Sequence, residues 1–281
     1  MTNEEALKLW WYYSLEVTPG VFTPGFGFDS AALVRKLLSG VELRGEPFLD
    51  LCSMDGMVSY IAARRCAEVT AWDRIDHGDK FAWLYQNNPR AFPDIRFVLG
   101  NGLSTASIGL PPYRAVVFAG LLYHVLDPVA SLLNARRMLQ DGGVMIVETA
   151  AVARPGHAMW FNEGGQFYPA PESANYWLPT KQCLVSMLRM ARLEVLDTAW
   201  FKQHGDVIRM AFACRAVDHD SFGWAGQQAA SENGRMTIAE FIDWSAVKSD
   251  RAPVGYAPQN AGELSIAERK RLSVLRLSDI T

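Results

Sequence analysis

Between residues 29 and 147, short apolar segments alternate with segments of helical periodicity. Five of the apolar segments have the length and composition of buried strands, namely residues 48–51, 68–72, 95–99, 115–119 and 144–147. Strands that are separated in sequence by helices form a parallel sheet with helices on both of its faces. The alternation therefore restricts this part of the chain to an α/β fold.

Residues at the segment boundaries support this interpretation. Residues 29–40 place apolar side chains on one face and end at a glycine, and the Asp-Pro pair at residues 127–128 is typical of a helix start. The periodicity of residues 180–192 predicts a further helix, and the apolar segments 193–199 and 207–214 predict a closing hairpin. We therefore expect a Rossmann-like, doubly wound sheet of seven strands whose last strand is antiparallel.

The sequence divides into three parts. Residues 1–44 are expected to form an N-terminal cap of helices, residues 45–217 the main domain, and residues 218–281 a C-terminal extension. The extension is too short for a strong core of its own, so we expect it to pack on the main domain or on a partner. Residues 150–178 lack clear periodicity and are rich in Gly, Pro and aromatic residues. A loop of this kind predicts a segment that covers a ligand pocket.

Charge and cysteine spacing exclude several classes of function. The chain has 27 Lys and Arg against 30 Asp and Glu and no basic run, so nucleic acid is not an expected partner. No apolar stretch approaches the roughly 20 residues that cross a bilayer, and the acidic start lacks a signal-peptide pattern. We therefore expect a cytoplasmic protein without membrane contact. The four cysteines lack CxxC spacing, so neither a metal site nor a disulfide is expected.

The ends of the predicted strands indicate where a ligand binds, because ligands of open parallel sheets lie beyond the carboxyl ends of the strands. Asp73 ends the second strand about twenty residues after the first turn, where an acid can accept hydrogen bonds from both ribose hydroxyls of an adenosyl cofactor. Residues 52–56 precede a helix N-terminus, which favours an anion. This turn lacks G-x-G-x-x-G spacing, so a methionine carboxylate fits better than a pyrophosphate.

Several motifs that occur in order resemble one enzyme family. Residues 48–56 (FLDLCSMDG) and 64–73 (RRCAEVTAWD) look like the first two motifs of class I S-adenosylmethionine (SAM)-dependent methyltransferases. Residues 120–128 (GLLYHVLDP) and 147–149 (VET) resemble the pattern of the family related to tRNA wobble-uridine methyltransferases, many relatives of which modify natural products or sugars. The resemblance covers about residues 10–215.

The resemblance implies that SAM is the cofactor. The residues it implies for binding are Asp50, Cys52, Ser53, Gly56, Gly120 and Leu121 around the methionine portion, Asp73 and Arg74 at the ribose, and Asn101, Gly102 and Leu103 at the adenine. The sequence departs from the family at Cys52, where glycine is usual, and at residues 191–193 (ARL), where Ala-Gly-Phe is common. A side chain at residue 52 is expected to narrow the approach of the methionine portion to the backbone.

Methyl transfer is an in-line displacement, which requires an aligned nucleophile and the exclusion of water. The resemblance implies that Tyr123 and His124 face the reacting centre. A histidine can remove the proton of a hydroxyl acceptor, and His124 is the first candidate for this base, with His157 as the alternative. His124 could instead position the loop by hydrogen bonding, and Tyr123 could simply pack or could contact the sulfonium.

The acceptor is expected to be a small molecule, bound by residues of the N-terminal part, the fifth strand and the long loop. These residues are Tyr12, Tyr13, Glu148, Trp160, Tyr168, Asn175, Tyr176 and Trp177. Alternatively, the aromatic side chains only hold the loops together and Glu148 anchors other residues. The expected function is O-methylation of a small natural-product or sugar-like acceptor, with carbon or nitrogen as other possible acceptor atoms, by a monomer or homodimer. The alternatives are tRNA wobble-uridine modification and a degenerate protein that binds SAM without methyl transfer.

Overall fold

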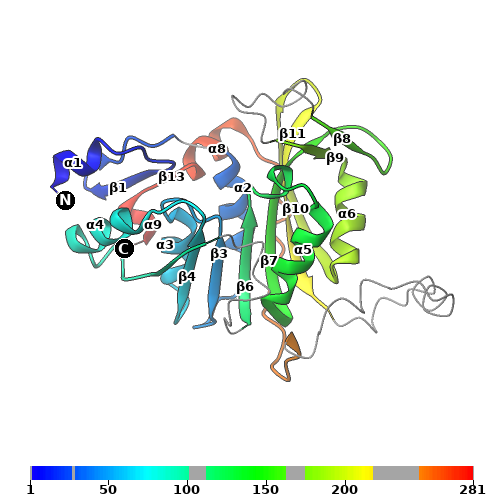
Figure 1. The fold of residues 1–281 in the computed structure, drawn as a ribbon, viewed down its shortest axis with the longest axis horizontal. Coiled ribbons are helices and arrows are strands. Elements are labelled where there is room, and N and C mark those ends of the chain that lie inside the picture. Colours follow the sequence, from blue (N-terminus) through cyan, green and yellow to red (C-terminus); the bar gives the residue numbers. More distant parts are fainter. Residues whose placement is uncertain (1, 27–28, 101–111, 163–174, 218–246, 281) are drawn as a thin grey trace.

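The computed structural model describes residues 2–26, 29–100, 112–162, 175–217 and 247–280. Within these residues, the centre of the fold is an eight-stranded sheet with the order β12-β10-β11-β7-β6-β3-β4-β5 (Figure 1). Its strands are β3 (Phe48–Leu51), β4 (Val69–Asp73), β5 (Arg96–Leu99), β6 (Tyr113–Ala119), β7 (Leu139–Val152), β10 (Leu193–His204), β11 (Val207–Ala216) and β12 (Gly262–Glu263).

The sheet is mixed. The five strands from β5 to β7 in the sheet order are parallel, whereas β11 is antiparallel to both β7 and β10. The expected α/β, Rossmann-like fold is confirmed. Among the described residues, the central sheet has eight strands rather than the expected seven, because β12 of the extension pairs with β10. A strand of two residues is too short to show the alternation by which a strand is recognised in sequence.

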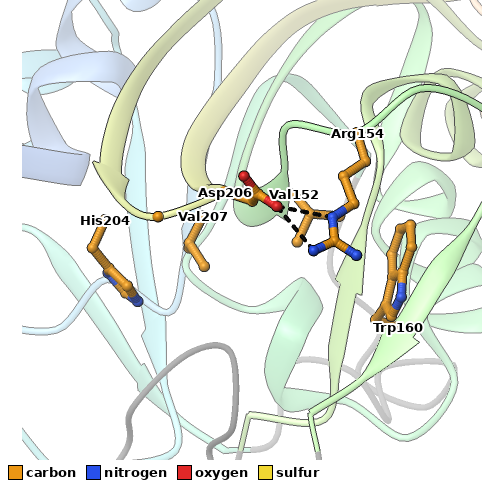
Figure 2. Close-up of a pocket in the computed structure, with 7 residues that line it drawn as sticks. Val152, Arg154, Trp160, His204, Asp206 and Val207 are labelled. Carbon is orange, nitrogen blue, oxygen red and sulfur yellow. Dashed lines mark hydrogen bonds and ion pairs between the residues drawn. The ribbon is translucent and has the colours of Figure 1, made fainter.

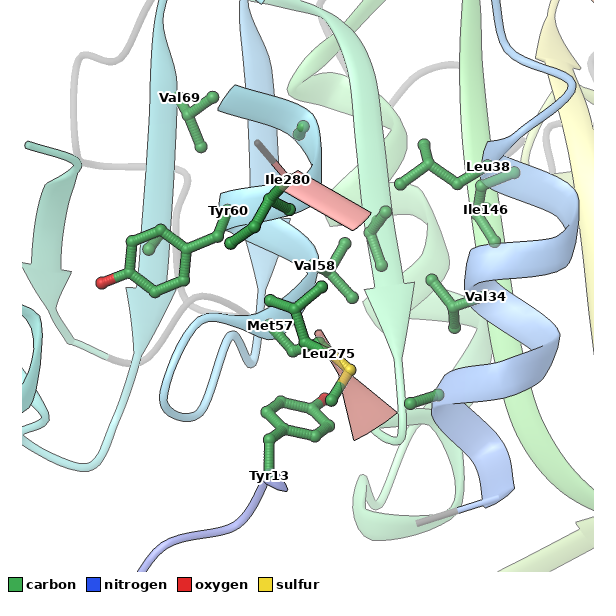
Figure 3. Close-up of a cluster of buried hydrophobic side chains, with 14 of the residues drawn as sticks. Tyr13, Val34, Leu38, Met57, Val58, Tyr60, Val69, Ile146, Leu275 and Ile280 are labelled. Atoms are coloured by element: carbon green, nitrogen blue, oxygen red, sulfur yellow. The ribbon is translucent and has the colours of Figure 1, made fainter. Parts of the chain in front are cut away.

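Helices cover both faces of the sheet. They are α2 (Asp29–Leu38), α3 (Met57–Ala63) and α4 (Gly78–Asn87) on one face, and α5 (Pro128–Arg137) and α6 (Lys181–Met190) on the other. Figure 3 shows the first core, to which Val34 of α2, Val58 of α3 and Ile146 of β7 belong. Met145, the neighbour of Ile146, belongs to the opposite core, as strand geometry requires. Among the helices described, none combines the length and apolar composition of a bilayer span.

The two terminal parts of the chain pair with each other. Residues 2–26 contain α1 (Asn3–Leu7), β1 (Ser14–Thr18) and β2 (Val21–Phe22), so strands accompany the expected helices. In the extension, α8 (Ile266–Leu272) packs on α2, and β13 (Val274–Leu275), which precedes α9 (Leu277–Ile280), pairs in parallel with β1. Arg35 of α2 donates to the carbonyl oxygens of Leu272 and Val274 at 2.9 and 2.6 Å. The extension therefore packs on the rest of the chain, while the boundaries at residues 44 and 217 stay a prediction.

The segment after β7, which the sequence predicts to be an irregular loop, contains a small hairpin. Its strands β8 (Met159–Phe161) and β9 (Trp177–Pro179) are antiparallel (Figure 1). Each has only three residues, which again is too few for recognition from periodicity. The hairpin lies beyond the end of β7, next to the 3-10 helix η2 (Leu122–His124) that follows β6.

Candidate functional site

Asp73 ends β4 at the carboxyl edge of the sheet, where its side chain is buried. Its Oδ2 accepts a hydrogen bond from the backbone N–H of Met54 at 2.8 Å, and its Oδ1 accepts one from Ile75 at 2.9 Å. The carboxylate therefore faces the turn after β3, which is the turn expected to hold the methionine portion of the cofactor. Arg74 beside it is exposed.

The turn after β3 has side chains at positions that favour glycine. Cys52 and Met54 have φ values of 60° and 50°, in the left-handed region that costs a residue with a side chain about 1–2 kcal/mol. Gly56 has φ 84°, and a Cβ there would lie 2.6 Å from the Phe81 ring. Only glycine therefore fits at residue 56. The sequence draws attention to Cys52 but gives no comparable signal for the backbone of Met54.

Two polar side chains lie in the floor of this turn. The Ser59 hydroxyl donates to Asp50 Oδ2 at 2.7 Å. Burial raises the pKa of Asp50 to about 7; the Ser59 hydrogen bond opposes this shift and the charge of Asp73 adds to it. Ser53 Oγ is buried, and within the described part of the chain it has no hydrogen-bond partner. Because buried polar atoms are usually paired, Ser53 has the capacity to bind a polar ligand atom.

The N-terminal part of the chain is held against this turn by Asp55. The backbone N–H groups of Tyr12 and Tyr13 donate to the Asp55 carboxylate at 2.8 and 3.2 Å. Burial raises the pKa of the Tyr12 hydroxyl, and the neighbouring Tyr123 contributes to the shift, so Tyr12 is a neutral hydrogen-bond donor. Tyr13 is also buried, and burial raises its pKa too. The structure thus brings both tyrosines to the site although they lie about 40 residues before the turn in sequence.

A buried ion pair lies behind the end of β6. Arg209 Nε and Nη2 donate to the two carboxylate oxygens of Glu148 at 2.7 Å each, and the side chains are 5% and 1% exposed. The Gly120 N–H also donates to Glu148 Oε2, at 3.1 Å. The Arg209 guanidinium lies 4.9 Å from the centre of the Tyr123 ring. Sequence reasoning missed Arg209, although a single charge inside the apolar segment 207–214 was a signal that it has a buried partner.

The structure separates the three candidates for the catalytic group. Tyr123 is 7% exposed and packs against Ala150 of β7. His124 is exposed, and its ring centre lies 4.2 Å from that of Tyr123. His157 is exposed too, and its Nδ1 lies 3.1 Å from Ser186 Oγ of α6 rather than beside the ion pair. Tyr123 and His124 therefore belong to the cluster at the end of β6, and His157 is engaged with α6.

The β8–β9 hairpin packs on the segment that carries Tyr123. The Tyr176 N–H donates to the Tyr123 carbonyl at 2.7 Å, and Trp177 Nε1 donates to the Leu126 carbonyl at 3.1 Å. Trp160 packs against the same apolar cluster as Tyr123. Asn175 is buried, and its Oδ1 has no hydrogen-bond partner among the described residues. These contacts hold the hairpin against the segment that carries Tyr123, and its role as a cover over a ligand pocket stays a prediction.

Some of the expected site residues lie outside the part of the chain that the structure describes, and one packs in a hydrophobic core. Asn101, Gly102, Leu103 and Tyr168 lie outside the described residues. Leu121 is half-buried and packs against the core under α5 and α6. Within the described residues, no group of three or more His, Cys, Asp or Glu side chains is placed to hold a metal ion.

Comparison with known proteins identifies the family to which the chain belongs. The crystal structure of the N-terminal domain of EvdMO1, in the presence of SAH and D-fucose, is 17% identical, covers 77% of this chain and 98% of that one, and has a TM-score of 0.54. A candidate methyltransferase from Bacillus halodurans is 15% identical, with coverage of 66% and 99% and a TM-score of 0.52. These likenesses show the fold. No curated protein matches the sequence. The methyltransferase-domain profile matches residues 28–198, which is more than half of the chain, and the chain therefore belongs to the methyltransferase-domain family.

Proposed function

We propose that this protein transfers a methyl group from SAM to an oxygen atom of a small natural-product or sugar-like acceptor. The observation that carries the proposal is the position of Asp73, whose buried carboxylate faces the turn after β3 at the carboxyl edge of the sheet. The test is incubation with isotopically labelled SAM and a cell extract, followed by mass analysis. Label in a small molecule that carries a new O-methyl group is the expected result, and label only in tRNA would contradict the proposal.

The residues of the turn fit SAM. Each oxygen of the Asp73 carboxylate accepts one backbone N–H and keeps capacity for a second donor, which suits the two hydroxyls of a ribose. Asp50 offers a carboxylate to the α-ammonium group, and Ser53 Oγ, which has no partner among the described residues, offers a further hydrogen bond. Cys52 is half-buried, and burial raises the pKa of its thiol, so its side chain brings no negative charge to this turn. When bound, SAM supplies an electrophilic methyl group.

The pKa of Asp50 predicts how cofactor binding depends on pH. Because this pKa is about 7 in the folded protein, the ionised fraction of Asp50 rises from about one-tenth to nine-tenths between pH 6 and pH 8. The α-ammonium group binds the ionised form, so the affinity for S-adenosylhomocysteine, measured by calorimetry, is expected to rise by up to about tenfold over this range. Asp50→Asn is expected to bind weakly and with little dependence on pH.

Asp55 provides the matched control, because burial raises its pKa to about 6 and its carboxylate binds backbone N–H groups of the N-terminal part instead. Asp55→Asn should keep the rise in affinity between pH 6 and pH 8. A flat profile in the unmodified protein would contradict the role of Asp50. The raised pKa also makes the stability of the protein depend on pH. Asp50 contributes most to the free energy of unfolding at a pH below the pKa that Asp50 has in the unfolded chain, and this contribution is lost as the pH rises through about 7.

On the acceptor side, the ion pair of Glu148 and Arg209 fixes both Gly120 and the ring of Tyr123. Tyr12 remains a neutral donor beside this cluster. His124, exposed and packed against Tyr123, is the group in the cluster that can take the proton from an acceptor hydroxyl as the C–O bond forms. The chain's own residues thus orient the acceptor and accept its proton.

Removal of His124 tests this assignment. His124→Ala is expected to lower kcat by about 10²-fold or more, the usual contribution of a general base, without changing the affinity for S-adenosylhomocysteine. The measurement is the rate of label transfer to the identified acceptor, together with calorimetry. His157→Ala serves as the comparison and should keep its activity. The opposite pattern, with loss in His157→Ala alone, would transfer the role of base to His157.

A further inference from the structure

A pocket outside the proposed cofactor and catalytic residues lies at the end of β7, beside the turn that joins β10 and β11. It has a volume of about 220 Å³ and is lined by Val152, Arg154, Trp160, His204, Gly205, Asp206 and Val207 (Figure 2). Arg154 and Asp206 form an ion pair with Nε and Nη2 each 2.9 Å from Oδ2. The size suits one ring rather than a whole drug-sized molecule.

The pocket lies on the same face of the sheet as the ion pair of Glu148 and Arg209. Side chains of a strand alternate between faces, so Glu148, Ala150 and Val152 of β7 point to one side. Residues paired across antiparallel strands share a face, and Val207 and Arg209 of β11 pair with Val152 and Ala150. One row of side chains therefore leads from the ion pair to the floor of the pocket.

Two aromatic residues connect the pocket to the candidate catalytic cluster. Tyr123 packs with Ala150 and Val152, and Trp160, which lines the pocket, packs against the same group. Val152 lies four residues beyond Glu148 on β7, a separation of about 13 Å along a strand. A molecule that reaches both places must therefore be longer than a single ring.

We propose that this pocket is a distal subsite for the acceptor and that it binds a neutral, hydroxylated, sugar-like ring. The inference rests on the proposed function, because it assumes that the acceptor's reacting hydroxyl lies near His124. It adds that the acceptor has a second ring, which lies at the Val152 end of the row that begins at Glu148, as a glycosylated natural product could provide.

The lining of the pocket favours hydroxyl groups over a charged group. The pair of Arg154 and Asp206 presents hydrogen-bond donors beside acceptors with no net charge, and neighbouring hydroxyls both donate and accept. A carboxylate on the ligand would be repelled by the charge of Asp206 and would have to compete with Asp206 for the Arg154 guanidinium. Val152, Val207 and the Trp160 indole supply an apolar surface for the C–H groups of a ring.

The test uses simple glycosides and the full-length protein saturated with S-adenosylhomocysteine. Methyl β-D-glucopyranoside, methyl β-D-galactopyranoside and methyl α-L-rhamnopyranoside are titrated while the ¹⁵N–¹H signal of the Trp160 indole is followed by NMR; Trp160→Phe assigns this signal. At least one glycoside should shift it with saturation, at a dissociation constant of roughly 10 mM, as expected for one ring at a partly open site. Asp206→Asn should weaken this binding at least about fivefold.

The control variant is Arg44→Gln, because Arg44 forms an exposed ion pair with Glu42 away from the pocket residues. It should leave the glycoside affinity unchanged. The inference is overturned if no glycoside shifts the signal at about 100 mM, if glucuronate shifts it and the neutral glycosides do not, or if Asp206→Asn binds them as tightly as the unmodified protein. Calorimetry with S-adenosylhomocysteine on the same samples tests the proposed function separately, since Asp206 lies outside the cofactor turn.

Discussion

Replacing Asp73 with alanine is expected to weaken binding of S-adenosylhomocysteine by at least about 10²-fold. Two ribose hydroxyls would lose a charged acceptor, and each hydrogen bond to a charged group contributes about 1.5–3 kcal/mol. The same carboxylate holds the N–H groups of Met54 and Ile75. The variant therefore loses both a ligand contact and the orientation of the turn that faces it. Calorimetric titration at a fixed pH measures the effect.

Two further variants separate these contributions. Asp73→Asn keeps the shape of the side chain and one acceptor oxygen, so its affinity for S-adenosylhomocysteine should lie between those of Asp73→Ala and the unmodified protein. Asp79→Asn removes an exposed carboxylate from the first turn of α4 and should leave binding unchanged. Thermal unfolding shows whether each variant is folded. A folded Asp73→Ala variant that binds S-adenosylhomocysteine within about threefold of the unmodified protein, a difference of less than 1 kcal/mol, would remove the basis of the proposed function.

Replacing Arg209 with methionine is expected to lower the free energy of unfolding by about 3–5 kcal/mol. The substitution leaves the Glu148 carboxylate buried without its bidentate partner, and an unpaired buried charge is costly. Gly120 and the Tyr123 ring also lose a support, because Glu148 accepts from the Gly120 N–H and Arg209 lies against Tyr123. Urea unfolding followed by circular dichroism measures the loss of stability.

A double-mutant cycle identifies the cause of this loss. Glu148→Gln combined with Arg209→Met removes both charges, so the double variant should be less destabilised than the sum of the two single variants. Arg44→Met breaks the exposed pair with Glu42, whose side chains are 81% and 46% exposed, and should cost less than about 1 kcal/mol. Additive effects of the two buried substitutions would show that Glu148 and Arg209 do not stabilise each other.

The local sequence pattern was sufficient to predict the main strands and helices of the fold but not its shortest strands. The expected strand at residues 48–51 coincides with β3, and Asp127 and Pro128 begin α5 with the Asp127 side chain accepting from the Ala130 N–H at 2.9 Å. In contrast, the strands of two or three residues, such as β12 and β8, were not predicted. Such strands exist because a neighbouring strand holds them, and not because of their own sequence.

The proposed cofactor side of the candidate site was easier to predict from the sequence than the proposed acceptor side. Asp50 is the next-to-last residue of β3 and Asp73 is the last residue of β4. Parallel strands end at one edge of the sheet, so the proximity of the two residues follows from the order of the elements. Arg209 reaches Glu148 from a strand that runs in the opposite direction, and it is 61 residues away in sequence. The candidate site also depends on the backbone of Met54, whose positive φ has no signature in the sequence.

The sequence by itself determined the α/β class and the methyltransferase family, and it predicted which edge of the sheet binds a ligand, because these depend on periodicity, short motifs and strand ends that are local in the chain. Only the tertiary structure decided that Tyr12 lies over the turn, that Arg209 pairs with Glu148, and that the row beyond Ala150 ends in a pocket. The physical reason is that these contacts join segments whose registers and faces are set by packing against one another. No single segment contains that information.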